Sequence, residues 1–164
     1  MKVYHGSTAI VQKPDVTFGR TNLDFGTGFY TTDKRMQAEK WVQRFIRLGK
    51  RCFINIYNFD DTNLPLNCKY KHFLKYDEEW LDFIISCRYG GKDYLNYNVI
   101  EGGIANDKVF NTIELYFDNL IDKQETLKRL IFEKPNNQIC FISQDIVNKY
   151  LHFEKAEEVF IESK

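Results

Sequence analysis

The sequence predicts an α+β fold in which helices pack on a small, largely antiparallel β core. Hydrophobic residues make up 43% and aromatic residues 16% of the 164 residues, and disordered chains have few aromatics. Short stretches with strand-like alternation are mixed with stretches of helical periodicity, without the regular order of βαβ units. No repeat or linker interrupts the chain, so residues 1–164 are expected to form one domain.

The N-terminal third is predicted to contain a strand, a long loop and a helix. Residues 3–5 resemble a short strand that ends at Gly6. Residues 7–29 are rich in Gly, Thr, Asn and Asp and lack helical periodicity, which indicates a loop. Thr32 is a suitable helix N-cap, with Asp33 in the first turn. The apolar residues at helical spacing that follow, up to a glycine stop, are Ala38, Trp41, Val42, Phe45 and Leu48.

The middle of the chain is predicted to hold two strands with a helix between them. Residues 51–59 show strand-like alternation, and the stretch 60–67 is rich in turn residues. Asp77 is expected to cap a helix, which Gly90 and Gly91 end. A short strand over residues 97–101 is closed by a second glycine pair.

The last third is predicted to be mixed as well. A helix is expected over about residues 106–120, and Asp122 with Glu125 forms a plausible capping box for the next one. The remaining expected elements are a strand over residues 138–142, a short helix capped by Ser143 and a final strand over residues 158–161.

The charge pattern excludes few partners, and the lack of targeting segments indicates the expected location. The 23 basic and 23 acidic residues balance, so the whole chain exerts no steering towards nucleic acid or anionic membranes. A local basic run lies between Lys34 and Arg51 and could bind the phosphates of a nucleic-acid acceptor, although such a run is usually a solvated helix face. The chain shows no signal segment and no transmembrane-length apolar run, so a cytoplasmic location without membrane contact is expected.

The four cysteines are widely spaced and form no C-x-x-C pair, so no metal site is expected. Cys52, Cys87 and Cys140 lie in apolar surroundings and are expected to be buried as small hydrophobic residues. A Rossmann fingerprint is also absent, because Gly26-Thr27-Gly28 lacks the third glycine and the preceding strand.

The first segment that could carry chemistry is Tyr4-His5-Gly6-Ser7. A histidine at a strand end, followed by Gly and Ser, presents an imidazole, free backbone groups and a hydroxyl together. Because glycine lets a ligand approach the main chain closely, the segment suits a carboxamide, which needs one donor and one acceptor. The alternative interpretation is a simple turn with His5 as an edge residue of the strand.

The second segment runs from Asp24 to Thr32 and reads Asp-Phe-Gly-Thr-Gly-Phe-Tyr-Thr-Thr. Its paired glycines precede two aromatic residues, and the predicted helix follows. Tyr30 therefore lies near a helix N-terminus, where its ring could stack on a flat heteroaromatic group and the amides favour anions. The alternative is a hairpin turn followed by core aromatics.

Together the two segments resemble the ADP-ribosyltransferase superfamily, in the branch with a His-Tyr-Glu triad. That branch has a His-Gly-Ser motif and a Phe-Gly-x-Gly-[Ile/Val]-Tyr-Phe motif before a helix. The chain also looks similar, along most of its length, to a bacterial family of unknown function within this superfamily. The shared motifs are His5-Gly6-Ser7, Asp24 to Thr32, the segment from Gly102 to Asp107, and Asn137-Gln138-Ile139-Cys140-Phe141.

The resemblance implies a split, mostly antiparallel β core and a cleft for NAD⁺ as co-substrate. His5 would bind the ribose on the adenosine side, the Gly6 backbone the nicotinamide carboxamide, and Ser7 the nicotinamide ribose. Tyr30 would stack on the nicotinamide ring. The residues implied to contact NAD⁺ are His5, Gly6, Ser7, Phe25, Gly28, Tyr30 and Thr31.

The third residue of the triad departs from the pattern. Where transferases of this branch usually have glutamate, this chain has Gln138, which can donate a hydrogen bond but cannot act as a base. Asp107 is the expected functional carboxylate, because rifamycin-modifying ADP-ribosyltransferases lack the glutamate and place an aspartate after a similar segment. Asp107 could instead be a helix N-terminal carboxylate, and Glu101 is a weaker candidate.

Other conspicuous residues are expected to be structural. His72 lies in a charged and aromatic loop and His152 beside Phe153 near the C-terminus. The aromatic pair Trp41 and Phe45 is expected to be core at helical spacing.

Three functions are compatible with these residues. The leading hypothesis is mono-ADP-ribosylation of a protein or nucleic-acid acceptor, and the resemblance implies a toxin of a toxin–antitoxin or phage-defence system with an antitoxin partner. The alternatives are an NAD glycohydrolase with water as acceptor, and a non-catalytic NAD or ADP-ribose binding module. The absent glutamate at Gln138 is the main feature that favours the binding module.

Overall fold

The protein has an α+β fold, as the sequence predicts. The computed structural model describes residues 1–104 and 107–160. Its strands are β1 (Lys2–Ser7), β2 (Phe29–Thr31), β3 (Cys52–Phe59), β4 (Tyr70–His72), β5 (Val99–Gly103), β6 (Asn137–Phe141) and β7 (Leu151–Val159). Its helices are α1 (Arg35–Ile46), α2 (Glu78–Arg88), α3 (Asp107–Phe117), α4 (Lys123–Leu130) and α5 (Gln144–Tyr150), with a 3₁₀ turn at Asp93–Asn96.

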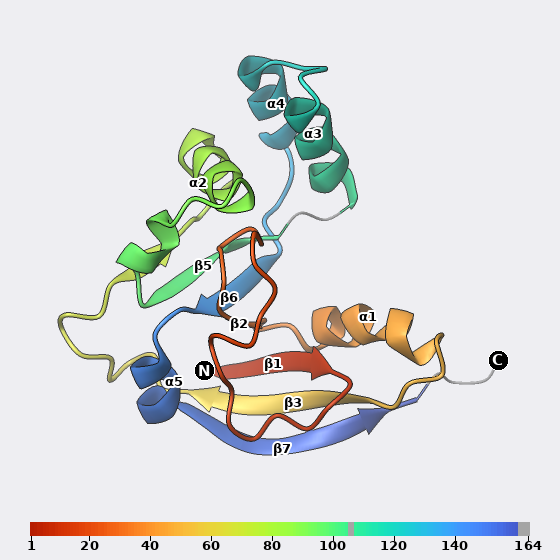
Figure 1. Ribbon diagram of the computed structural model, residues 1–164, viewed down its shortest axis with the longest axis vertical. Helices are drawn as coiled ribbons and strands as arrows, with labels where there is room; N and C mark the ends of the chain where they lie inside the picture. Colours follow the sequence, from red (N-terminus) through yellow and green to blue (C-terminus); the bar gives the residue numbers. More distant parts are fainter. Residues whose placement is uncertain (105–106, 161–164) are drawn as a thin grey trace.

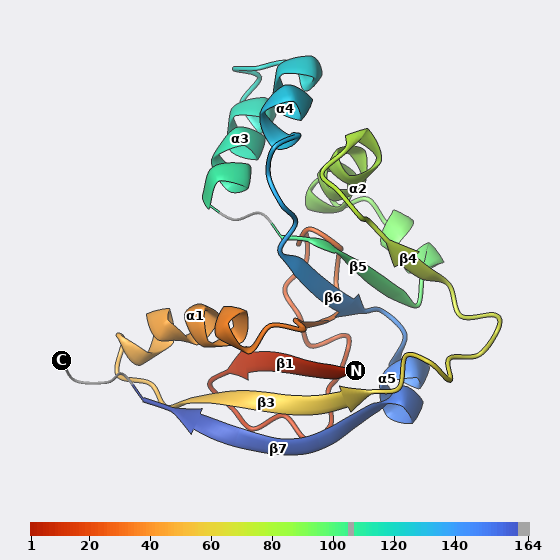
Figure 2. The ribbon, with the colours of Figure 1, turned by 180° about the vertical axis from the view of Figure 1, so that it is seen from behind.

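The strands of the described residues form two sheets that are joined by a backbone bridge between β1 and the end of β2. One sheet has the order β1-β3-β7 and is antiparallel; the other has the order β2-β6-β5-β4, and only β4 and β5 are parallel. The sheets meet where Tyr4 and Thr32 exchange backbone hydrogen bonds of 2.8 and 2.9 Å. Figures 1 and 2 show β1 and β2 running close together there and the two sheets spreading apart beyond it.

Three apolar clusters hold these layers together. The first lies between the two sheets and includes Val3, Phe29, Tyr57 and Phe141. The second covers the opposite face of the β2-β6-β5-β4 sheet beneath α2, α3 and α4 (Figure 1), and the third joins α1 to the β1-β3-β7 sheet. Each sheet is therefore packed on both faces over part of its area. Cys52, Cys87 and Cys140 are buried as predicted.

The long loop between β1 and β2 is tied to the first sheet by buried polar groups. The fully buried Asn55 on β3 accepts a hydrogen bond from the Val11 amide at 2.8 Å and donates one to the Ala9 carbonyl at 3.1 Å. The Tyr57 hydroxyl donates to the Val11 carbonyl at 2.5 Å. Buried polar groups need such partners, so this loop has a defined path although it contains no helix or strand.

Three of the predicted helix caps are confirmed and one is wrong. The side chains of Asp77, Asp122 and Ser143 accept hydrogen bonds from the first turns of α2, α4 and α5. Thr32 does not cap α1, because its backbone is committed to the contact with Tyr4. The helix begins later, at Arg35, after Lys34, which makes no side-chain cap. The Thr32 hydroxyl instead accepts from the Lys34 amide at 3.1 Å.

The strands differ from the prediction in two places. The segment around His72, expected to be a loop, forms β4, and only three residues pair there with β5. The last strand begins at Leu151, seven residues before the predicted start, and pairs with β3 along its length.

The apolar stripe predicted on α1 is only partly buried. Ala38 and Val42 are buried, but Trp41 is 48% and Leu48 73% exposed, so the prediction that Trp41 belongs to the core is wrong. Only a narrow strip of this helix faces the sheet. No helix in the described part of the chain is both long and apolar enough to cross a membrane.

Candidate functional site

His5 lies on β1 where the two sheets begin to part. Its Nδ1 is 2.7 Å from the carbonyl oxygen of Tyr30 on β2, and its ring centroid is 4.5 Å from that of Phe29. A carbonyl only accepts, so Nδ1 carries the proton and donates, which leaves Nε2 of the neutral ring as an acceptor. Burial lowers the pKa of His5, although the bond to Tyr30 acts in the opposite direction. No hydrogen-bond partner of Nε2 lies among the described residues, so this atom can accept from a ligand hydroxyl.

The backbone groups of Gly6 point to the edge of β1 that faces away from β3. Hydrogen-bonding directions alternate along a strand, and the groups of Tyr4 point to Thr32, so those of Gly6 point to the same side. Beyond Tyr4 that side has no paired strand in the described structure. One donor and one acceptor, side by side, match the needs of a carboxamide.

Gly6 also has a packing role that the sequence did not indicate. A Cβ at this position would lie 2.6 Å from the Ala38 carbonyl oxygen and 2.7 Å from a methyl group of Val42. The absence of a side chain therefore lets α1 pack directly on β1. The space on that face of Gly6 is filled by the helix, so a ligand would reach the backbone from the side of β2.

Tyr30 is fixed to the turn that precedes it. Its hydroxyl donates to the Gly26 carbonyl at 2.6 Å and accepts from the Phe25 amide at 3.1 Å. Gly26 has a φ of 74°, the left-handed region that glycine adopts readily. Burial, followed by the neighbouring Cys140, raises the pKa of Tyr30 well above its usual range, so the phenol stays protonated. The ring is half-buried and held in one orientation.

The same turn is anchored from outside by an ion pair. Arg88 at the end of α2 donates from Nε and Nη2 to Asp24 at 2.8 Å, and from Nη1 to Glu114 of α3 at 3.3 Å. Arg88 and Asp24 are only 17% and 16% exposed. Arg88 was not predicted as a site residue, and its place in the sequence, far from the motif it stabilises, gives no signal of this role.

Gln138 lies on β6, the strand next to Tyr30. Tyr30 is paired with Cys140, and side chains two apart on a strand share a face, so Gln138 lies on the same face as Tyr30. Its side chain is half-buried and has no hydrogen-bond partner among the described residues. β1, β2 and β6 therefore bring His5, Tyr30 and Gln138 onto three neighbouring strands.

Glu101 lies on the opposite face of this sheet. It is paired with Ile139, whose side chain packs between the sheets, whereas Tyr30 and Cys140 face the helices. Its carboxylate is 2.6 Å from the Tyr70 hydroxyl, 3.4 Å from the Asn137 amide nitrogen and 3.5 Å from Nε2 of His72. Glu101 and His72 thus belong to a polar cluster that joins β4, β5 and β6. Asp107 begins α3, and its side chain lies outside the described residues.

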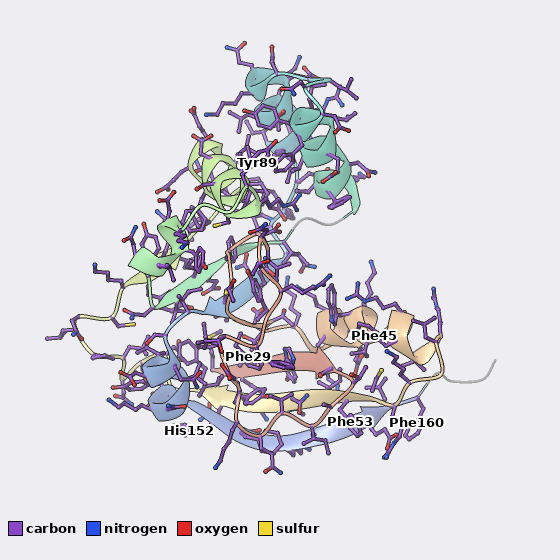
Figure 3. All side chains as sticks on the ribbon, in the orientation of Figure 1. Phe29, Phe45, Phe53, Tyr89, His152 and Phe160 are labelled. Atoms are coloured by element: carbon purple, nitrogen blue, oxygen red, sulfur yellow. The ribbon has the colours of Figure 1, made fainter. Side chains whose placement is uncertain are left out.

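The other predicted contacts support the framework around Tyr30. Phe25 is fully buried, with its ring 6.0 Å from that of Phe73. At Gly28 a Cβ would lie 2.5 Å from the sulfur of Cys140. Thr31 is buried and donates to the Ile139 carbonyl at 3.3 Å, while the Ser7 hydroxyl accepts from the Ala9 amide at 3.2 Å. Figure 3 shows Phe29 between β1 and the second sheet.

A polar cavity of about 320 Å³ lies apart from this site, between α5 and the segment before β4. Its walls include Asn67, Cys68, Asn98 and Lys149. None of the residues predicted to bind NAD⁺ lines it.

The chain belongs to the family described as protein of unknown function (DUF3990), whose model matches residues 1–153. A search of the curated proteins and a search of the solved structures found no match. The matched residues include every helix and strand of the described fold except most of β7, from residue 154 onwards.

Proposed function

We propose that the protein is an NAD⁺-dependent mono-ADP-ribosyltransferase whose site is built on His5, Gly6 and Tyr30. The observation that carries the proposal is the hydrogen bond from His5 Nδ1 to the Tyr30 carbonyl. It joins the two motifs that resemble this superfamily, and it leaves Nε2 of the neutral ring as an acceptor. The resemblance itself rests on the sequence motifs, and the family description does not include an activity.

The groups at the sheet junction fit the parts of NAD⁺. The Gly6 N–H and C=O match the two hydrogen bonds of the nicotinamide carboxamide. The fixed ring of Tyr30 offers a surface for the nicotinamide ring, and His5 Nε2 can accept from a ribose hydroxyl. All of these groups are held by bonds within the fold, so little rearrangement would be needed on binding.

In the proposed reaction the bond between C1′ of the ribose and the nicotinamide nitrogen breaks, and its electron pair leaves with nicotinamide. A nucleophilic atom of the acceptor forms the new bond to C1′ and releases its proton to solvent. Since the leaving group is already good, the protein acts mainly by positioning NAD⁺ and stabilising the oxocarbenium-like transition state. We propose that Gln138 donates a hydrogen bond to the ribose. We also propose that Asp107 supplies the carboxylate that the glutamate of the triad provides in similar transferases.

The test is nicotinamide release from NAD⁺, measured with and without cell lysate. Release is expected to depend on His5 and Tyr30, so His5→Ala and Tyr30→Ala should abolish it, while His152→Ala, which changes an exposed residue of β7, should retain it. Comparing Asp107→Ala with Gln138→Ala shows which of these two residues takes the place of the third residue of the triad. Stimulation by lysate indicates transfer, and equal release without lysate indicates NAD⁺ hydrolysis.

A binding module without catalysis is the competing function, and Gln138 favours it because a glutamine cannot accept a proton. This alternative predicts saturable NAD⁺ or ADP-ribose binding with no nicotinamide release under any condition. That result would contradict the proposed transferase.

A further inference from the structure

The exposed side of α1 carries an aromatic residue stacked with a cation. Trp41 is 48% exposed, and the guanidinium carbon of Arg44 lies 3.6 Å from its ring centroid. The same guanidinium lies 4.6 Å from the ring of Phe45. This arrangement holds two flat groups at the surface, and both indole rings and guanidinium planes stack on nucleobases.

Cations without acidic partners surround this stack. Elsewhere in the basic run, Arg35 pairs with Glu39 and Glu157, and Arg51 pairs with Glu158. Within the described residues, the exposed cations of this region that form no ion pair include Arg20, Lys40, Arg44 and Arg47. Lys34 and Lys50, at the two ends of the basic run, also form none, and Lys34 donates to the side-chain oxygen of Asn136 at 3.1 Å.

Two of these cations come from different parts of the chain and lie near each other. Arg20 belongs to the loop between β1 and β2, and Arg44 to the last turn of α1. Burial, and then the charge of Arg20, lower the pKa of Arg44. Like charges gathered without a counter-ion favour an anionic ligand.

This surface borders the site described above. The helix packs on β1 directly against Gly6, through Ala38 and Val42. Trp41 lies between those two residues in the sequence but on the solvent side of the helix. Figure 1 shows α1 running from the end of β2 alongside β1, next to the place where the sheets part. A ligand bound along α1 would therefore reach the candidate site.

We propose that Arg20, Lys40, Trp41, Arg44 and Arg47, here called the α1 surface, bind single-stranded nucleic acid as the ADP-ribose acceptor. The inference rests on the proposed function, because it names the acceptor class of that site. Unpaired bases can stack on Trp41 and Arg44, whereas the faces of bases in a duplex are already covered. Lys40 and Arg47 lie about two helical turns apart, so they can contact successive phosphates.

The experiment is fluorescence anisotropy with the full chain and no NAD⁺, using a labelled 12-nucleotide single strand of mixed sequence, as RNA and as DNA. The same sequence as a duplex and a glutamate-rich peptide are the competing probes. The single strand is expected to bind most tightly. With four cations, the slope of log affinity against log salt should be about −3.

Matched variants make the test specific. Trp41→Ala should weaken binding about tenfold, and Phe132→Ala, which removes another exposed aromatic side chain, should not. The double variant Lys40→Glu with Arg47→Glu should weaken binding far more than Lys92→Glu with Lys128→Glu, which changes the net charge equally on other exposed surfaces.

Three results would overturn the inference: tighter binding of the duplex or the acidic peptide, equal loss in both charge-reversal pairs, or full affinity in Trp41→Ala. Loss of NAD⁺ binding in Trp41→Ala with unchanged oligonucleotide affinity would also overturn it, by assigning Trp41 to the nucleotide cleft. Nicotinamide release is measured separately, so failure of the transferase proposal is seen independently of oligonucleotide binding.

Discussion

His5 Nδ1 lies 2.7 Å from the carbonyl oxygen of Tyr30, and this bond joins β1 to β2 beyond the point where their backbone pairing ends. The side chain thus supplies a hydrogen bond between the two sheets at a position where their backbones are not paired. It also fixes the tautomer of the imidazole, because the carbonyl can only accept. One residue therefore supports the junction and presents Nε2 to the candidate site.

The first prediction concerns the pH dependence of stability. Burial lowers the pKa of His5 in the folded state below 6.5, so the unfolded chain binds a proton more readily than the folded one. The contribution of His5 is complete above pH 6.5 and is lost as pH falls from 6.5 through the lower folded pKa. Urea unfolding at several pH values should show this loss in the wild type and a smaller loss in His5→Gln. The control is His152→Gln, and an identical slope in wild type and His5→Gln would contradict the prediction.

The second prediction separates the hydroxyl of Tyr30 from its ring. Tyr30→Phe removes two hydrogen bonds to the turn and should lower the free energy of unfolding by about 1–2 kcal/mol, measured by urea denaturation. Because the ring remains, NAD⁺ affinity should fall much less than in Tyr30→Ala. Tyr89→Phe, at a 71% exposed residue, is the matched control and should not change stability. Unchanged stability in Tyr30→Phe would show that the turn does not depend on these bonds.

The third prediction tests the close approach of α1 to β1. Gly6→Ala would place a methyl group 2.6 Å from the Ala38 carbonyl oxygen, and overpacking of this kind costs about 1–3 kcal/mol. Thermal unfolding should show the loss. Val42→Ala should not restore stability in the double variant, because the clash with the backbone of Ala38 remains. Full rescue by Val42→Ala would assign the effect to the side-chain contact alone.

The fourth prediction concerns the position of Gln138. If this residue faces the ribose, Gln138→Glu introduces a carboxylate that can accept a proton and stabilise positive charge, so nicotinamide release should rise about tenfold or more. Gln138→Ala should lower it. Gln124→Glu, at an exposed residue of α4, makes the same chemical change away from the site and should have no effect. A fall in release with Gln138→Glu would place the third role elsewhere, with Asp107 as the next residue to test.

Much of the fold could be predicted where a local signal exists. The caps at Asp77, Asp122 and Ser143 place three helix starts correctly, because each side chain bonds to its own first turn. β4 could not be predicted, since three residues with charged neighbours form a strand only when β5 lies beside them. The start of β7 could not be predicted either, because its many charged residues form a strand only through pairing with β3.

The candidate site could be predicted only in part. Its motifs identify His5 and Tyr30 from nearby residues, but their hydrogen bond depends on how two sheets meet. Arg88 reaches Asp24 from 64 positions away, and no local pattern indicates that contact. Helical periodicity placed Trp41 in the core, yet α1 packs through the narrow strip of Ala38 and Val42 and leaves Trp41 exposed.

The central claim is that His5, at the junction of the sheets, is part of an NAD⁺ site. Calorimetric titration of NAD⁺ into the full-length chain, its His5→Ala variant and its His152→Ala variant tests this directly, with circular dichroism to confirm that each is folded. Saturable binding is expected to the wild type and to His152→Ala, and no binding to folded His5→Ala. Absence of binding to the wild type, or equal affinity in His5→Ala, would contradict it.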